Sequence, residues 1–251
     1  MIRIGITGQS GFVGTNLFNS LQRFPKKYQL ISFKDNFFYR DELLNEFVKY
    51  CDVIIHLAAI MRSPIKGEVY HTNVELVNKL ITSMNNCHVT PCILFSSSIQ
   101  DNMENEYGKS KRMGIALLKE WAHEYDTGFV AMRFPNLFGP YAKPNYSSFI
   151  ATFCYKLSHD ETPFIIQDND IPLIYIGNLV KYIMEIIDNT SINKTYSLVN
   201  FTPDKIIKVS DVLKLLEAFK QANKNGMEPV LSDEFEHNLY NTYQSYINYN
   251  I

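Results

Sequence analysis

A tyrosine and a lysine stand four residues apart in Tyr107-Gly-Lys-Ser-Lys111, at the start of a long stretch with helical spacing. Four residues make about one helical turn, so both side chains would share one face of the helix. A phenol with its ordinary pKa of about 10 is a poor acid at neutral pH, but a nearby ammonium group lowers that pKa. The spacing therefore predicts a tyrosine that can exchange a proton with a substrate oxygen.

Three serines, Ser96 to Ser98, follow an apolar strand expected at 91–95. Ligands of α/β sheets bind at the carboxyl ends of the strands, and a serine hydroxyl there can stabilise a developing oxyanion. Together with Tyr107 and Lys111, the serines indicate a site for redox chemistry between a carbonyl and an alcohol. Taken singly, the residues have ordinary explanations: a helix-end aromatic, a solvated charge and a helix cap.

A glycine-rich turn, Thr7-Gly-Gln-Ser-Gly-Phe-Val-Gly14, lies between the first expected strand and the first expected helix. Glycines allow a tight turn and a close approach of a pyrophosphate, while the helix N-terminus supplies free N–H groups. A purely structural turn is the alternative, but the strand–turn–helix context predicts dinucleotide binding. The residues expected to contact the dinucleotide here are Gly8, Ser10, Gly11, Phe12, Val13 and Gly14.

The end of the second expected strand, Ser32-Phe-Lys-Asp35, bears on the choice of coenzyme. An acidic residue at this position would accept the 2′-hydroxyl of NAD, whereas Lys34 favours a 2′-phosphate. Asp35 stands next to it, so a shift of one residue in the strand end would reverse the preference. We therefore expect NADPH as the cofactor, with NADH as the alternative.

The elements that must position these residues alternate between strand and helix, which predicts an α/β fold with a Rossmann-type, doubly wound parallel sheet. Apolar strands are expected at 2–6, 28–33, 52–57, 91–95 and 128–132. Amphipathic helices are expected at 13–24, 40–50, 73–85 and 107–125.

The pattern changes after Pro140, which predicts a dinucleotide-binding domain at 1–140 and a smaller C-terminal substrate-binding lobe at 141–251. The segment 171–187 is expected to return to the first domain, so the lobe would be discontinuous. In the lobe, strands are expected around 163–167 and 195–199, and helices at 147–157, 210–222 and 232–246. A core-facing stripe is expected in the last helix, formed by Phe235, Leu239, Tyr243 and Tyr246.

Five segments together resemble the extended short-chain dehydrogenase/reductase family, the NAD-dependent epimerases and dehydratases that act on sugar nucleotides. They are the turn at 7–14, His56-Leu-Ala-Ala59, the serines at 96–98, Tyr107-x-x-x-Lys111 and Arg133-Phe-Pro-Asn-Leu-Phe-Gly-Pro140. The resemblance covers essentially the whole chain. It is strongest to a subgroup that joins an NADPH-dependent reductase of a UDP-4-keto-6-deoxy-N-acetylhexosamine to a C-terminal cupin domain that epimerises C3. The segments similar to that subgroup are 96–100, 135–139, 143–146, 150–156 and 239–243.

The resemblance implies a role for each matching residue. Tyr107 would be the general acid, Lys111 would hold the ribose hydroxyls and lower the pKa of Tyr107, and Ser98 would bind the same substrate oxygen. The further cofactor contacts that it implies are Lys34, Leu57, Ala58, Ala59, Phe134 and Pro135, with Tyr107 and Lys111. The implied substrate contacts are Ser97, Ser98, Arg62, Asn136, Asn145 and Phe149. Asn136 as a structural loop anchor and Arg62 as a solvated charge are the alternatives.

The function implied is reduction of the 4-keto group of a nucleotide-linked deoxysugar, UDP-2-acetamido-2,6-dideoxy-4-hexulose, for surface polysaccharide biosynthesis. The sequence ends at Ile251, where the reductase half of the subgroup would end. We therefore expect the reduction alone, with any C3 epimerisation supplied by a separate cupin-type epimerase. One alternative is a 4-epimerase that retains NAD, and another is a non-catalytic dinucleotide-binding subunit of a separate epimerase.

Composition narrows the partners and the location. The 251 residues include 24 Lys and Arg against 26 Asp and Glu, and the signs of the charges alternate along the chain. We therefore expect no basic surface that binds nucleic acid. The apolar runs are too short to span a bilayer, and we expect a cytoplasmic protein. The four cysteines and six histidines lack the spacing of a metal site. We expect His56 to be a core histidine whose hydrogen bonds are satisfied. The cysteines are expected to be reduced thiols in the core. The family resemblance implies a homodimer formed through helices 73–85 and 107–124.

Overall fold

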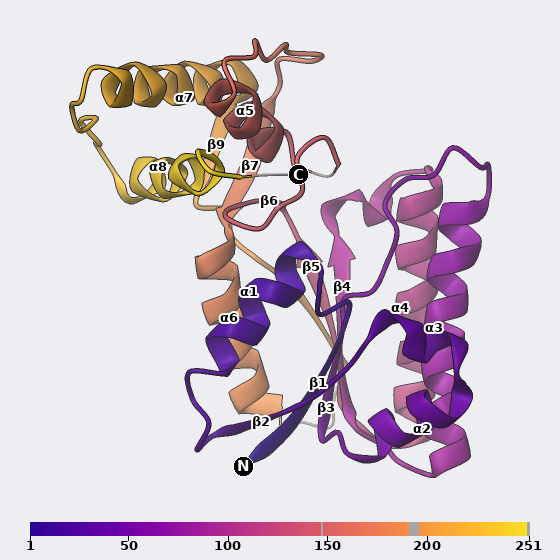
Figure 1. Ribbon diagram of the computed structural model, residues 1–251. Helices are drawn as coiled ribbons and strands as arrows, with labels where there is room; N and C mark the ends of the chain where they lie inside the picture. The colour runs from indigo at the N-terminus through magenta and orange to yellow at the C-terminus, as the bar shows by residue number, and fades with distance from the viewer. Residues whose placement is uncertain (147, 191–195, 250–251) are drawn as a thin grey trace. The chain divides into compact units, whose positions relative to one another are not determined.

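The computed structural model describes residues 1–146, 148–190 and 196–249, and the chain forms two compact units (Figure 1). Unit 1 comprises Met1–Phe134 and Val180–Phe201, and unit 2 comprises Pro135–Leu179 and Thr202–Ile251. The division thus falls after Phe134 instead of after Pro140. The returning segment runs from 180 to 201, where the sequence pattern suggested 171–187.

Unit 1 contains a six-stranded sheet in the order β2-β1-β3-β4-β5-β8, in which every neighbouring pair is parallel. The strands are β1 Ile2–Thr7, β2 Tyr28–Ile31, β3 Val53–His56, β4 Cys92–Ser98, β5 Phe129–Phe134 and β8 Tyr196–Asn200. The strand order reverses between β1 and β3, and such a switch point at the carboxyl ends of the strands is where α/β sheets bind ligands.

Helices cover both faces of this sheet, as Figure 1 shows, which confirms the Rossmann-type, doubly wound fold. On one face lie α1 Phe12–Leu21 and the part of α6 that belongs to unit 1, and on the other lie α2, α3 and α4. Their bounds are α2 Asp41–Lys49, α3 Glu68–Cys87, α4 Glu106–Glu124 and α6 Ile176–Thr190. Two short 3₁₀ helices, η1 Asp35–Tyr39 and η2 Ile99–Asn102, follow β2 and β4.

A hydrophobic core of unit 1 lies between the sheet and the helices α2, α3 and α4. All four residues of β3 are buried, because the strand is covered on both faces. Gly5 has no room for a larger residue, since an added Cβ would lie 2.4 Å from the ring of Phe47. Trp121 of α4 is buried and donates through Nε1 to Asn85 Oδ1 of α3 at 2.8 Å, so the two long helices form one layer.

Unit 2 is built on a three-stranded sheet in the order β6-β7-β9, in which β6 and β7 are parallel and β9 is antiparallel. Its elements are β6 Asn136–Phe138, α5 Phe149–Ser158, β7 Asp170–Tyr175, β9 Lys205–Lys208, α7 Val209–Lys224 and α8 Glu234–Tyr246. The start of the helix expected at 147 lies outside the described residues, and α5 begins at Phe149 after the cap residue Ser148.

Two expected strands of the C-terminal half are wrong or misplaced. Residues 163–167 form a loop instead of a strand, and Phe164 and Ile166 in it are 67% and 84% exposed, so the apolar run pairs with no sheet. The strand expected at 195–199 is β8, which pairs with β5 in unit 1 and not in the lobe. Thr195 lies outside the described residues.

The stripe expected in the last helix is confirmed: Phe235, Leu239, Tyr243 and Tyr246 are all buried. Tyr246 also donates its hydroxyl to the carbonyl oxygen of Ala142 at 2.5 Å. Helix α8 therefore both fills the core of unit 2 and anchors the loop that precedes α5.

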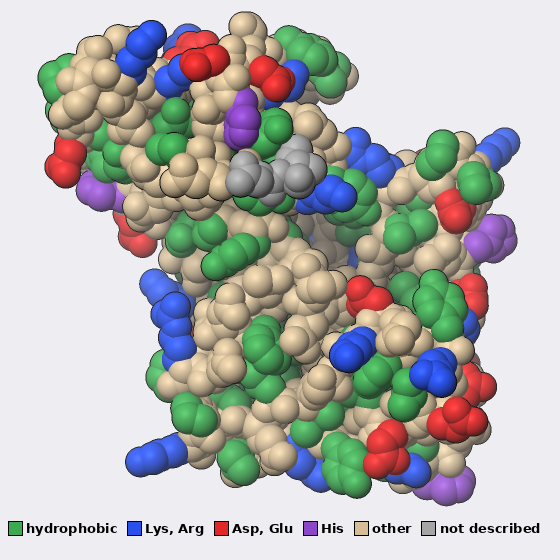
Figure 2. All heavy atoms as spheres, viewed as in Figure 1, with side chains coloured by type: hydrophobic (Ala, Val, Ile, Leu, Met, Phe, Trp, Pro, Cys, Tyr) green, Lys and Arg blue, Asp and Glu red, His purple; other side chains and the backbone are tan. Residues whose placement is uncertain are grey.

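The surface carries charges of both signs, interspersed on the face shown in Figure 2. Across the described ranges, none of the helices combines the length and the apolar character that crossing a bilayer demands. The same residues contain no group of three His, Cys, Asp or Glu side chains arranged to hold a metal ion. The four cysteines are thiols outside any disulfide, two of them buried and two half-buried.

Candidate active site

The glycine-rich turn between β1 and α1 has the geometry that its sequence demands. Gly8 has a φ of +69°, and an added Cβ would lie 2.8 Å from the backbone nitrogen of Ala58. A Cβ on Gly14 would lie 2.3 Å from the carbonyl oxygen of Gly8. Helix α1, described throughout, begins at Phe12 after the cap residue Gly11, with neither a side-chain cap nor an acidic residue in its first turn. Its N–H groups and positive dipole end are therefore suited to a pyrophosphate.

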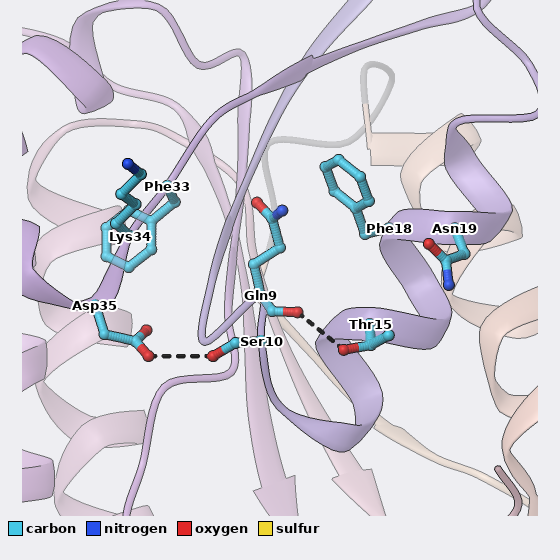
Figure 3. Close-up of a pocket in the computed structure, with 8 residues that line it drawn as sticks. All are labelled: Gln9, Ser10, Thr15, Phe18, Asn19, Phe33, Lys34 and Asp35. Carbon is cyan, nitrogen blue, oxygen red and sulfur yellow. Dashed lines mark hydrogen bonds between the residues drawn. The ribbon is translucent and has the colours of Figure 1, made fainter. Parts of the chain in front are cut away.

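A pocket of about 380 Å³ lies beside this turn, within unit 1 (Figure 3). Eight residues line it: Gln9, Ser10, Thr15, Phe18, Asn19, Phe33, Lys34 and Asp35. Ser10 Oγ donates to Asp35 Oδ2 at 3.2 Å, so the turn and the segment after β2 are tied together at the pocket wall. Gln9 Oε1 is buried and has no hydrogen-bond partner within the described part of the chain. The pocket wall thus combines a cation, Lys34, with a carboxylate, Asp35.

Lys111 is unusual among the charged residues of unit 1, because it is 2% exposed and forms no ion pair with a carboxylate of the described residues. Its Nζ donates to Ser96 Oγ at 3.3 Å, and lies 4.9 Å from the ring centre of Phe95 and 5.4 Å from that of Tyr107. Burial disfavours the charged form and lowers the pKa of Lys111 from 10.5 to about 7. The amino group of Lys111 therefore lies beside the Tyr107 ring in a place that water scarcely reaches.

Tyr107 is half-buried in the first turn of α4. Asn105 caps that helix by accepting a hydrogen bond from the backbone nitrogen of Gly108 at 2.7 Å. The structure therefore brings the predicted tyrosine and lysine together on one helix face. An ammonium beside a phenol favours the phenolate and so eases proton release.

The three serines that end β4 have three different surroundings. Ser96 contacts Lys111 and donates to the carbonyl oxygen of His56 at 3.2 Å. Ser97 donates to Asp101 Oδ2 at 2.9 Å. Ser98 is half-buried, and its Oγ accepts from the backbone nitrogen of Gln100 at 3.2 Å, capping η2. Sequence reasoning assigned roles to Ser97 and Ser98 and missed Ser96, the serine that holds the lysine.

His56 ends β3 inside the core, 1% exposed, with its Nδ1 2.7 Å from Thr7 Oγ1. Its Nε2 has no hydrogen-bond partner among the described residues, so only one ring nitrogen is satisfied, contrary to the expectation of a satisfied core histidine. Burial, with Lys111 nearby, lowers the pKa of His56 to about 3. Thr7 Oγ1 also accepts from the backbone nitrogen of Ala58, which fixes the loop of Leu57 to Ala59 beside the glycine turn.

Asn73 is a buried polar residue beside the candidate site that sequence reasoning missed. It is 5% exposed on α3, where its Oδ1 accepts from the backbone nitrogen of Ile60 and its Nδ2 donates to Ile60 O and Ser110 Oγ. It thereby joins the loop after β3 to the helix that carries Tyr107. The sequence pattern that could have identified Asn73 is helical spacing. Val77 and Leu80, at i+4 and i+7 from Asn73, are apolar and buried, so Asn73 shares their helix face.

The predicted substrate contacts are divided between the two units. Arg62 is exposed in unit 1. In unit 2, Asn136 donates from Nδ2 to the carbonyl oxygen of Pro172 at 3.3 Å, which is the geometry of a loop anchor. Asn145 has a φ of +56°, its backbone nitrogen donates to Thr152 Oγ1, and Phe149 packs edge-on against Phe153. Of the last two cofactor candidates, Phe134 is buried against Phe201 at the end of unit 1, and Pro135 begins unit 2.

The turn, the Tyr107–Lys111 pair and the parallel sheet define a dinucleotide-binding oxidoreductase fold. The profile of the NAD dependent epimerase/dehydratase family matches residues 4–200, and the chain belongs to this family. Membership makes a nicotinamide dinucleotide its cofactor, and the glycine turn and its pocket fit such a group.

Individual relatives carry the comparison further. The chain is 29% identical over 248 residues to a UDP-2-acetamido-2,6-beta-L-arabino-hexul-4-ose reductase of Pseudomonas aeruginosa, matching 98% of this chain and 65% of the reductase. It is 31% identical to the capsular polysaccharide assembling protein CapF of Staphylococcus aureus, with a TM-score of 0.80, over 99% of this chain and 67% of CapF. The chain thus spans about two thirds of the length of these relatives.

The fold is shared more widely. The structure of RMD from Pseudomonas aeruginosa complexed with NADPH aligns with a TM-score of 0.81 at 15% identity, over 99% of this chain and the whole of that one. At this identity the likeness concerns the fold alone.

Proposed function

We propose that this chain is an NAD(P)H-dependent reductase of the 4-keto group of a nucleotide-linked deoxysugar. The observation that carries the proposal is the buried Lys111, whose Nζ lies within 5.4 Å of the Tyr107 ring centre and 3.3 Å from Ser96 Oγ. A protein that only binds a dinucleotide does not need a desolvated ammonium beside a phenol. An enzyme that delivers a proton to a carbonyl oxygen does need this pair. The same sheet edge carries the dinucleotide turn.

In this mechanism the bound nicotinamide supplies the hydride. Tyr107 gives its hydroxyl proton to the substrate oxygen, and Ser98 binds that oxygen as its charge develops. Lys111 holds the ribose hydroxyls and lowers the pKa of Tyr107, because its positive charge stabilises the phenolate that proton transfer leaves behind. The protein's contribution is therefore orientation and proton delivery.

The cofactor contacts follow the turn and its pocket. The N–H groups of Phe12, Val13 and Gly14 would receive the pyrophosphate, while Leu57, Ala58 and Ala59 would border the adenosine end of the cofactor. Lys34 supports NADPH through attraction to a 2′-phosphate. Asp35, tied to Ser10, is the group that would favour NADH instead.

The substrate class rests on the relatives. The Pseudomonas reductase acts, by its name, on a UDP-2-acetamido-2,6-beta-L-arabino-hexul-4-ose. For this chain we propose a substrate of the same class, UDP-2-acetamido-2,6-dideoxy-4-hexulose, in surface polysaccharide assembly. Arg62, Asn136, Asn145, Phe149 and Ser97 are the candidate contacts. We further propose a cytoplasmic homodimer, with any C3 epimerisation carried out by a cupin-type epimerase.

The test is coenzyme oxidation, followed as loss of NADPH or NADH absorbance, with a UDP-4-keto-6-deoxy-N-acetylhexosamine made in situ by a 4,6-dehydratase. Wild type should oxidise NADPH faster than NADH, and Tyr107→Phe should lose the rate at least a hundredfold, on the order expected for removing a general acid. Tyr125→Phe, at the far end of the same helix, is the control and should keep the rate.

Two outcomes would count against the reductase. If folded wild type oxidises neither coenzyme with keto sugars of both the D and L series, the proposal fails. Tight retention of NAD through purification, with interconversion of 4-epimers, would identify an epimerase instead.

A further inference from the structure

One buried carboxylate near the candidate active site has no part in the proposed mechanism. Asp101 is 3% exposed, and it lies in the link 99–105, between Ser98 at the end of β4 and the first turns of α4 that carry Tyr107. A buried carboxylate is costly unless it is paired and hydrogen-bonded, so its partners indicate what it holds in place.

Those partners come from the ends of two neighbouring strands. Asp101 Oδ2 accepts from Ser97 Oγ at 2.9 Å and from Arg133 Nε at 2.8 Å. Ser97 and Arg133 are register partners in β4 and β5, so the carboxylate lies across the carboxyl ends of both strands. Arg133 in turn donates from Nη1 to Asn200 Oδ1 of β8 at 3.4 Å. The link is thereby fastened to three adjacent strands of the sheet.

The other side of the link is fastened to α4. Arg112 donates from Nη1 to the carbonyl oxygens of Asp101 at 2.5 Å and Met103 at 2.9 Å, and pairs through Nη2 with Glu104 at 2.7 Å. The first turn of α4 approaches so closely that a Cβ on Gly108 would lie 2.3 Å from the carbonyl oxygen of Gln100. Strand end, link and helix start therefore form one packed unit.

From this arrangement we infer that Asp101, held by Arg133, is a positioning residue that fixes the link and with it the placement of Ser98 relative to Tyr107. The inference rests on the proposed function, since it assigns Asp101 to the alignment of the hydrogen-bond donor and the acid of that reaction. A surface ion pair would not have this effect. Asp101 is nearly fully buried and is separated by two residues from Ser98 and by five from Tyr107.

The test compares Asp101→Asn with Asp52→Asn. Asp52 accepts from Arg3 Nη2 at 2.6 Å, so the control removes the same charge from another aspartate–arginine pair of unit 1, at the amino ends of β1 and β3. We expect Asp101→Asn to lower kcat of the reductase about tenfold to a hundredfold while the Kd of NADPH stays within about twofold. Asp52→Asn should change neither.

Amide hydrogen exchange of the coenzyme-free protein supplies a readout that does not depend on activity. In Asp101→Asn, exchange of residues 99–105 should accelerate at least tenfold, while β1 and α1 keep their protection. Ser97→Ala, which removes a single hydrogen bond, should do the same to a smaller extent and serves if Asp101→Asn does not fold.

The outcomes separate this inference from the proposed function. Unchanged kcat, or unchanged exchange in the link, overturns the positioning role even if wild type is an active reductase. A parallel loss of kcat and NADPH affinity with general loss of protection would make Asp101 merely structural and overturns it too. If wild type reduces no keto sugar, the proposed function fails, and the exchange of the link alone decides whether Asp101 fixes it.

Discussion

Lys111 shows at the scale of a single residue how the fold prepares a side chain for chemistry. The sequence marks it as a cation one turn after Tyr107, but its pKa of about 7 comes from complete burial. Ser96 Oγ and two aromatic rings replace the water that an exposed ammonium would have. These contacts do not compensate fully for the lost hydration of the ammonium group. The charged form of Lys111 therefore destabilises the coenzyme-free protein.

This cost predicts a pH-dependent stability. The pKa of Lys111 is about 7 in the folded chain and 10.5 ordinarily, so between these values the unfolded state binds the extra proton and stability rises with pH. Below the lower value both states are charged and the full penalty applies. Lys111→Met should therefore raise the free energy of unfolding at about pH 6 by a few kcal/mol, with the gain shrinking as the pH approaches 10.

Denaturant unfolding of the coenzyme-free protein at several pH values checks this. Lys79→Met is the matched control, because Lys79 is paired with Glu75 at 2.8 Å on α3. It should bring no such gain. A Lys111→Met variant less stable than wild type at about pH 6 would contradict the prediction, since it would mean that the buried ammonium stabilises the fold.

At the scale of elements, the strand–turn–helix unit of β1 and α1 binds its ligand with backbone groups, so glycine positions decide both the fold and the site. Gly11 and Gly14, at the N-terminal end of α1, differ in their surroundings. A Cβ on Gly14 would lie 2.3 Å from Gly8 O, whereas a Cβ on Gly11 would lie 3.2 Å from the same atom. The first distance cannot be relieved without moving backbone, and the second needs only a shift of a few tenths of an ångström.

Gly14→Ala should therefore displace the turn, weaken NADPH binding at least tenfold and lower the free energy of unfolding by about 1–3 kcal/mol. Gly11→Ala should keep the stability of wild type within about 1 kcal/mol. Fluorescence titration with NADPH and thermal unfolding measure the two effects. Equal stability of the two variants would show that the turn adapts to a Cβ at either position.

Other elements show where patterns mislead. The apolar residues at 163–167 have the composition of a strand, yet they lie in a loop, with Phe164 and Ile166 exposed, while β7 begins at Asp170. The strand β8 has the expected residues but joins β5 of unit 1, which no local pattern can specify. Periodicity reports how a segment could be buried, and the partner that buries it is chosen by the rest of the chain.

At the scale of the whole molecule, the family resemblance predicts a homodimer formed through α3 and α4. Met113 of α4 is 39% exposed, and a charge placed there would be buried on dimerisation without a partner. Sedimentation at micromolar concentration should give twice the monomer mass for wild type and the monomer mass for Met113→Glu. Met227→Glu, at a 58% exposed residue of unit 2, is the control and should stay dimeric. A monomeric wild type would contradict the prediction.

The sequence by itself determined the features that depend on neighbouring residues. The α/β alternation, the glycine spacing at 8, 11 and 14, and the placement of Tyr107 and Lys111 one turn apart are local patterns, and each is read within a few residues. The buried stripe of α8 is of the same kind. Such features follow from backbone geometry and the helical period, so they can be predicted from the sequence of a single segment.

Only the tertiary structure decided which side chains meet across segments distant in sequence. It joined Lys111 to Ser96, Asn73 to Ser110, and Asp101 to Arg133. It also placed the unit boundary after Phe134. These pairings are set by the register of parallel strands and by the burial of polar groups that must find partners. The paired residues are 15 to 37 positions apart, and no local sequence pattern links them.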